Sequence, residues 1–151
     1  MRAASLALLL LATGCATVGS VSSRPLGDGT GRSFTASLPD TRDALRIAFD
    51  STGMGLKDSA QVNDSTLMIV GSQGLSAWSY GEVVRVVLVG RQDTTDVRVV
   101  TAKRLATTVF ATGDWSTKLF KYMSAALADS GRRIVDAAPP LLSQGSAVPA
   151  P

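Results

Sequence analysis

Histidine is absent from this chain of 151 residues, and cysteine occurs only once, at Cys15. Without an imidazole group the protein has no Ser/His/Asp triad, no Cys/His pair and no histidine-based metal site. These absences exclude most hydrolase mechanisms. We therefore predict neither a metal nor a cofactor.

Carboxylates are the remaining candidates for catalysis, because a pair of acidic side chains suffices for glycoside hydrolysis. Glu82 is the only glutamate, and it precedes a predicted strand alone. The aspartates fall mostly at predicted helix starts or in a predicted turn, where Asp is ordinary. These aspartates are Asp40, Asp43, Asp114, Asp93 and Asp96. No acidic pair has a reason in the sequence to be buried, so we predict that the protein is not an enzyme.

Charge and aromatic content are also low. The chain has 15 Lys+Arg against 12 Asp+Glu, and aromatic residues make up only 5% of it. A formal net charge of +3 is too mild to indicate nucleic acid as a partner. The apolar residues are mainly Val, Leu and Ala, which suffice for a small core.

The N-terminus has the order of a secretory signal, with Arg2 before an apolar stretch at 3–12 and small residues before Cys15. A stretch of about ten apolar residues is too short for a transmembrane helix, which needs about 20. Cys15 could instead be buried as a small hydrophobe, but it would then lie at the cleavage point by chance. We predict a signal peptide over 1–14 and lipid attachment at Cys15.

The run Leu11-Ala12-Thr13-Gly14-Cys15 resembles the lipobox of bacterial lipoproteins, which ends Leu-Ala-Gly-Cys or a close variant. In that family the cysteine is diacylated and becomes the new N-terminus. An Asp in the next position is the usual signal for inner-membrane retention, and Ala16 stands there instead. The resemblance implies a lipid-anchored protein on the periplasmic face of the outer membrane, with no free thiol.

Composition divides the rest of the chain into three parts. Residues 15–31 are rich in Ser, Gly and Thr and lack a regular period, which predicts a flexible tether after the lipidated cysteine. Residues 137–151 contain four prolines among small residues and are typical of a disordered tail. The folded domain is therefore expected over 32–136.

Periodicity within this domain predicts an α+β fold, with an antiparallel sheet of four to five strands and two helices packed on one face. Strands are expected at 33–38, 56–62, 66–71, 83–89 and 97–102, with a loop at 72–81. One helix should begin at Asp40 and end at Gly53, and the other should begin at Asp114 and end at Gly131.

Alternation along the strands and helices predicts which side chains are buried. The core face of the 83–102 hairpin should carry Val84, Val86, Leu88, Val97 and Val99. The apolar arcs of the two helices should be Ala44, Leu45, Ile47, Ala48 and Phe49, and Trp115, Leu119, Tyr122, Met123, Ala126 and Leu127.

Two groups of residues are candidate binding sites. The opposite face of the hairpin should carry Arg85, Arg91, Arg98 and Arg104. These guanidinium groups could bind an anion, or they could form a solvated face whose arginine stems cover valines. Trp78 and Tyr80 lie in the predicted loop, where they could be contact anchors or fold back onto the sheet.

The domain itself is similar to small bacterial envelope lipoproteins, through the segment Thr101–Thr108 and the run Gly113-Asp114-Trp115-Ser116. Its topology also resembles the helix-grip domains of outer-membrane assembly lipoproteins. The resemblance implies location and fold but no reaction. It leads to the hypothesis of a non-enzymatic module with an envelope protein partner. The alternative hypothesis is a binder of peptidoglycan or lipopolysaccharide that uses the arginine face.

Overall fold

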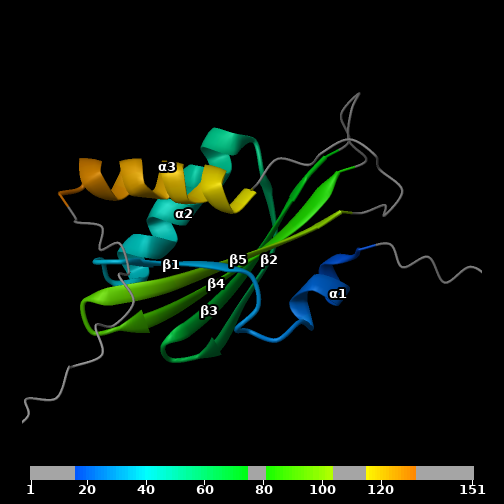
Figure 1. Cartoon of the computed structure of the whole chain (residues 1–151), viewed down its shortest axis with the longest axis horizontal. Coiled ribbons are helices and arrows are strands. Elements are labelled where there is room, and N and C mark those ends of the chain that lie inside the picture. Colours follow the sequence, from blue (N-terminus) through cyan, green and yellow to red (C-terminus); the bar gives the residue numbers. More distant parts are fainter. Residues whose placement is uncertain (1–15, 75–80, 104–114, 132–151) are drawn as a thin grey trace, which may run out of the picture.

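The computed structural model describes residues 16–74, 81–103 and 115–131, and it shows one antiparallel sheet with helices on both faces (Figure 1). The five strands lie in the order β1-β5-β4-β3-β2. The elements are α1 (Val18–Ser22), β1 (Thr30–Phe34), α2 (Leu38–Thr52), β2 (Gly55–Asn63), β3 (Thr66–Gln73), β4 (Glu82–Arg91), β5 (Thr94–Lys103) and α3 (Trp115–Asp129). The predicted α+β fold is confirmed.

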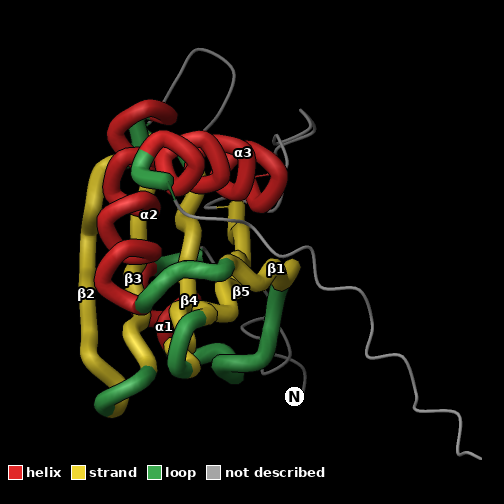
Figure 2. Tube along the Cα trace, turned by 90° about the vertical axis from the view of Figure 1, so that its left-hand side faces the viewer, coloured by secondary structure: helices red, strands yellow, loops and turns green. Residues whose placement is uncertain are grey.

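Helices α2 and α3 lie side by side on one face of the sheet, and the short helix α1 lies on the other (Figures 1 and 2). We call these the helix face and the outer face. The main core lies between the sheet and the two long helices. Its members include Phe34, Leu45, Leu88 and Leu119, all at most 1% exposed. Burial of this apolar surface is the main term that stabilises the domain.

The β4–β5 hairpin follows the predicted alternation. Arg91 pairs with Thr94, so Gln92 and Asp93 form a two-residue turn, and Gln92 has a positive φ of 24°. The five residues predicted for the core face all belong to the main core: Val84, Val86, Leu88, Val97 and Val99. Valine runs of this kind suit a strand because β-branched side chains pack well on a pleated surface.

Helix α2 begins earlier than predicted. Its N-cap is Ser37, whose side chain accepts from the backbone N–H of Asp40. The carboxylate of Asp40 in turn accepts from the Ser37 hydroxyl at 2.6 Å. The preceding strand ends at Phe34, so the prediction of a strand reaching residue 38 is wrong. Gly53 ends the helix as predicted, in the left-handed conformation with φ of 69° that favours glycine.

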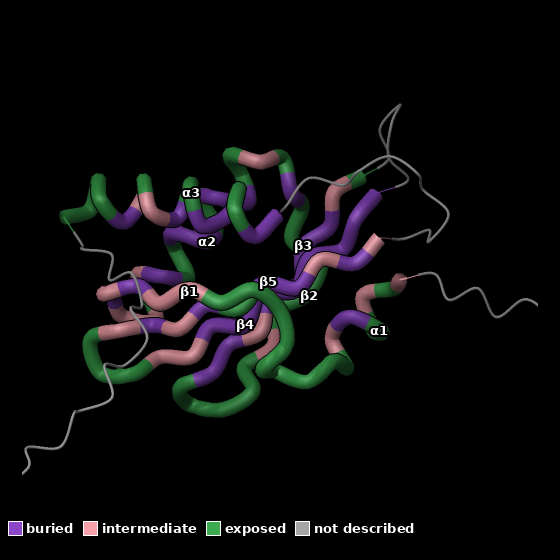
Figure 3. The backbone as a smooth tube through the Cα atoms, in the orientation of Figure 1, coloured by how far each residue is buried: buried purple, intermediate pink, exposed green. Residues whose placement is uncertain are grey.

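Two members of the predicted helical arcs lie outside the core. Ile47 is 53% exposed on α2 and Tyr122 is 39% exposed on α3. Phe120 is buried instead of Tyr122, and its ring contacts Phe34 with centroids 6.1 Å apart. Both residues lie at one end of a predicted arc, where the rotation of the helix against the sheet decides burial. Figure 3 shows the remaining pattern, with a buried sheet centre and exposed outer sides of the helices.

The N-terminal segment is not the flexible tether that its composition predicts. Residues 18–22 form α1, and Val21 is fully buried against the outer face of the sheet. It packs with Val70, Val83 and Ala102 in a second, smaller apolar cluster. Ala16 and Val18 also pack against this cluster, so the folded domain includes residues before 32, which the prediction left out.

Candidate functional site

Helix α1 is short, but local hydrogen bonds determine both of its ends. The hydroxyl of Thr17 accepts from the backbone N–H of Ser20 at 3.1 Å, and the hydroxyl of Ser20 accepts from the N–H of Thr17 at 2.9 Å. This reciprocal pair is a capping box, which satisfies two otherwise unpaired donors. Isolated helices of this length are unstable in water, so α1 depends on its packing against the sheet.

Arg85 holds the chain that follows α1. It lies on the outer face of β4, where it is fully buried. Its Nη1 donates to the backbone carbonyl of Arg24 at 2.5 Å, and its Nη2 donates to that of Pro25 at 2.8 Å. Its Nε is buried without a hydrogen-bond partner among the described residues. The guanidinium group thus attaches the segment after α1 to the middle of the sheet.

Electrostatics at Arg85 reflects this burial. Desolvation lowers the pKa of its guanidinium below the ordinary value, the carboxylate of Asp28 opposes the shift, and Arg24 adds to it. Arginine ordinarily titrates far above neutrality, so the group remains charged at pH 7. A buried charge is tolerated only with hydrogen-bonding partners, and the two carbonyls are those partners here.

The four predicted arginines therefore do not form an open binding face. Arg98 shares the outer face with Arg85 and donates to the carbonyl of Gly27 at 2.9 Å. Arg91 forms an exposed ion pair with Asp96 at 3.0 Å. Arg104 lies outside the described residues. Alternation placed Arg85 and Arg98 on one face correctly, but it carries no information about the segment that covers Arg85. Because Arg85 is fully buried, the prediction of an open surface of four arginines is wrong.

Gly29 allows this segment to pass close to β5. Its φ is +101°, and a Cβ atom there would lie 2.3 Å from the carbonyl oxygen of Val99 and 2.7 Å from Cγ2 of Val100. Only glycine fits such a position without displacing the backbone. The glycines of this region serve the return of the chain from α1 into β1, although their composition alone suggested flexibility.

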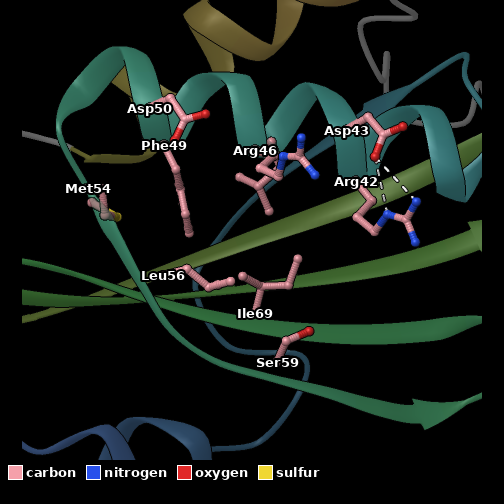
Figure 4. A pocket seen from close by; sticks show the side chains of 10 residues that line it. Arg42, Asp43, Arg46, Phe49, Asp50, Met54, Leu56, Ser59 and Ile69 are labelled. Atoms are coloured by element: carbon pink, nitrogen blue, oxygen red, sulfur yellow. Dashed lines mark hydrogen bonds and ion pairs between the residues drawn. The ribbon is translucent and has the colours of Figure 1, made fainter.

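On the helix face, a pocket opens between α2 and the edge strand β2 (Figure 4). We call it the α2–β2 pocket. It has a volume of about 190 Å³, below the roughly 300–1,000 Å³ of typical small-molecule sites. Its lining residues are Arg42, Asp43, Leu45, Arg46, Phe49, Asp50, Met54, Leu56, Ser59 and Ile69. This size suits one apolar side chain better than a whole small-molecule ligand.

The walls of the pocket are apolar and its rim is charged. Figure 4 shows Phe49 reaching down from α2, Ile69 pointing up from the sheet, and Leu56 lying sideways below Phe49. Leu56 is 59% exposed, which is unusual for a leucine on a strand beside a core. Gly71 of β3 leaves space that Phe49 and Met54 fill, since a Cβ there would lie 2.8 Å from both. The pocket depends on how α2 crosses the sheet, so the sequence contained no signal for it.

Glu82 and Trp115 form a buried polar contact at the end of the sheet where α3 begins. Glu82 is 4% exposed and Trp115 is 3% exposed, and the indole Nε1 donates to Oε2 of the carboxylate. Lys118 lies over the indole ring, 4.7 Å from its centroid. Lys103 is the residue opposite Glu82 on β5. The sole glutamate therefore joins β4 to α3.

The other predicted sites, Cys15, Trp78 and Tyr80, lie outside the described residues, as does Asp114 at the expected start of α3. Within the described ranges, no group of three or more acidic or thiol side chains is placed to hold a metal ion. No helix among those ranges is long and apolar enough to cross a membrane. No protein-family model matches the chain, and no curated protein sequence is significantly similar to it.

Proposed function

We propose that the protein is a non-enzymatic, lipid-anchored domain of the bacterial cell envelope that binds a protein partner from the periplasmic face of the outer membrane. The position of Cys15 carries this proposal. It ends a segment with the order of a secretory signal, in a run that resembles a lipobox. Thr17 caps α1 and Ala16 packs against the outer face of the sheet, so a lipid on Cys15 would be attached next to the folded domain.

Intact mass of the protein purified from native membranes tests the anchor, with a Cys15→Ser variant as the control. We expect a mature chain that begins at residue 15 and carries added diacylglycerol and acyl mass. The variant should retain the unmodified mass and leave the membrane fraction. An uncleaved or unmodified wild-type chain would contradict the proposal.

The α2–β2 pocket is the surface that suits a protein partner. Among the described strands, β2 is an edge strand bonded only to β3, so its outer backbone groups can pair with an added strand. Leu56 and the pocket beside it can take one apolar side chain from such a segment. We infer that the partner presents an extended segment with an apolar anchor, which is a common mode of peptide recognition.

Two exposed apolar residues on β2 allow a matched test. Leu56 lines the pocket, whereas Val62, which is 44% exposed, does not. A photo-crosslinking amino acid placed at each position in the lipidated protein should give a discrete adduct in the envelope from position 56 only. Adding Arg46→Ala, a change on the exposed rim of the pocket, to the position-56 protein should weaken that adduct. Equal adducts from both positions, or none from position 56, would rule out the pocket as the contact site.

A further inference from the structure

The position of α1 determines how the domain can sit on a membrane. Ala16 packs against the outer-face cluster, and Val21 is fully buried in it. Cys15 is bonded to Ala16, and consecutive Cα atoms are about 3.8 Å apart. A lipid on Cys15 would therefore be attached one residue away from the outer-face cluster.

Bilayer dimensions then limit the distance between this face and the lipids. The polar headgroup region on each side of the hydrocarbon core is only about 5–8 Å thick. The lipid would hold Cys15 at the boundary of that core, and α1, with five residues, is about 7.5 Å long. The length of α1 is thus comparable to the thickness of the headgroup region.

The exposed residues of this region suit a headgroup layer. Leu26 is 39% exposed in the segment after α1, and Arg24 beside it is exposed. Arg98 is exposed on the same face and contacts the segment through Gly27. Asp28 is the only acidic residue between Ala16 and Gly31, and the strands add Asp58 on β2 and Asp96, which is paired with Arg91, to the same face. An apolar side chain flanked by arginines matches the interface of an anionic leaflet.

We propose that the outer face of the sheet, with α1 and the segment 22–29, lies against the membrane surface and contacts lipid headgroups. This inference rests on the proposed lipidation of Cys15. Helices α2 and α3 occupy the opposite face of the sheet (Figure 2). The α2–β2 pocket then opens toward the aqueous compartment, where a protein partner can reach it.

Single-cysteine labelling tests this orientation, because the only native thiol is consumed by the lipid. A fluorophore is placed at Leu26→Cys on the proposed membrane side, or at Ile47→Cys on α2, where the native side chain is 53% exposed. Each lipidated protein is reconstituted into vesicles of phosphatidylethanolamine and phosphatidylglycerol that contain a headgroup-quencher lipid. We expect at least about threefold stronger quenching at position 26. Ser23→Cys and Lys121→Cys, at two further exposed positions, repeat the comparison if either first variant fails to fold.

The outcomes separate the orientation from the anchor. Intact mass and flotation with the vesicles first show whether each protein carries its lipid. If the protein is lipidated and floats but positions 26 and 47 are quenched equally, or neither is quenched, the orientation is wrong and the anchor stands. If the chain carries no lipid, the proposed function and the orientation both fail.

Discussion

The guanidinium of Arg85 lies beneath the chain at Pro25, and its Nη2 donates to the backbone carbonyl of that residue at 2.8 Å. A strand residue at the centre of the sheet thus binds a segment 60 positions earlier in the chain. This contact explains why the composition of residues 16–31 misled the prediction of a tether. Serine and glycine make a chain flexible only where nothing holds it.

Replacing Arg85 with methionine should release this segment. The carbonyls of Arg24 and Pro25 would lose their charged donor, and a hydrogen bond to a charged group contributes about 1.5–3 kcal/mol. We expect a loss of about 2–3 kcal/mol in the free energy of unfolding by urea, because the freed segment regains some hydration. Hydrogen exchange should accelerate mainly over residues 16–29.

Arg91→Met is the matched control for this change. Arg91 lies on the same strand, but its side chain is 71% exposed and its ion pair with Asp96 is on the surface. Exposed pairs of this kind contribute about 0–1 kcal/mol, so the control should differ little from wild type. Equal destabilisation by the two variants would show that Arg85 does not hold the segment.

Gly29→Ala should also disturb the return from α1 into β1. The new Cβ would lie 2.3 Å from the carbonyl oxygen of Val99, at a φ of +101°. Strained backbone costs about 1–3 kcal/mol, and the steric overlap adds to this, so we expect a loss of at least about 2 kcal/mol in urea unfolding. Gly27→Ala meets no atom within 4 Å and should stay within about 1 kcal/mol of wild type. Similar losses from both would contradict the close approach.

The regular part of the fold could be predicted because its signals are local. Alternation in the two valine-rich strands placed Val86 and Val99 in the core, and the left-handed Gly53 ended α2 as expected. The start of α2 was harder to predict, because Ser37 and Asp40 are both good capping residues. In the structure Ser37 is the N-cap, and its hydroxyl donates to the carboxylate of Asp40. The margins of the arcs, at Ile47 and Tyr122, depend on how each helix rotates against the sheet.

The contacts of α1 and Arg85 and the α2–β2 pocket depend on tertiary packing and could not be predicted. A five-residue helix such as α1 is too short to show a 3.6-residue period. The face that Arg85 occupies could be predicted, but not the segment that covers it. The α2–β2 pocket combines Phe49 with Leu56 and Ile69, residues whose approach is set by the crossing of α2 over the sheet. The sequence predicts which face of the sheet a strand residue occupies, but it does not predict how the helices and the N-terminal segment pack on that face.

The register of α3 can be tested by substituting two residues that lie on opposite sides of the helix. Leu119 is fully buried and Lys121 is exposed. Leu119→Asp would bury an unpaired charge, which costs several kcal/mol, so we expect the domain to be unfolded at 25 °C by circular dichroism. Lys121→Asp should change stability by about 0.5 kcal/mol or less. Comparable melting of the two variants would refute the assigned register.

Glu82 and Trp115 should be energetically coupled across the junction of β4 and α3. Glu82→Ala leaves the buried indole N–H without its acceptor, and we expect a loss of about 2–3 kcal/mol in the free energy of unfolding. Glu82→Gln keeps an oxygen that can accept from the indole, so its loss should be about half as large or less.

A double-mutant cycle separates this contact from the other interactions of Glu82. Trp115→Phe removes the donor and keeps an aromatic ring for packing, so adding Glu82→Ala to it should cost about 1–2 kcal/mol less than Glu82→Ala alone. Chemical denaturation followed by far-ultraviolet circular dichroism measures each corner of the cycle without relying on tryptophan fluorescence. A coupling energy near zero would mean that Glu82 stabilises the junction through groups other than the indole.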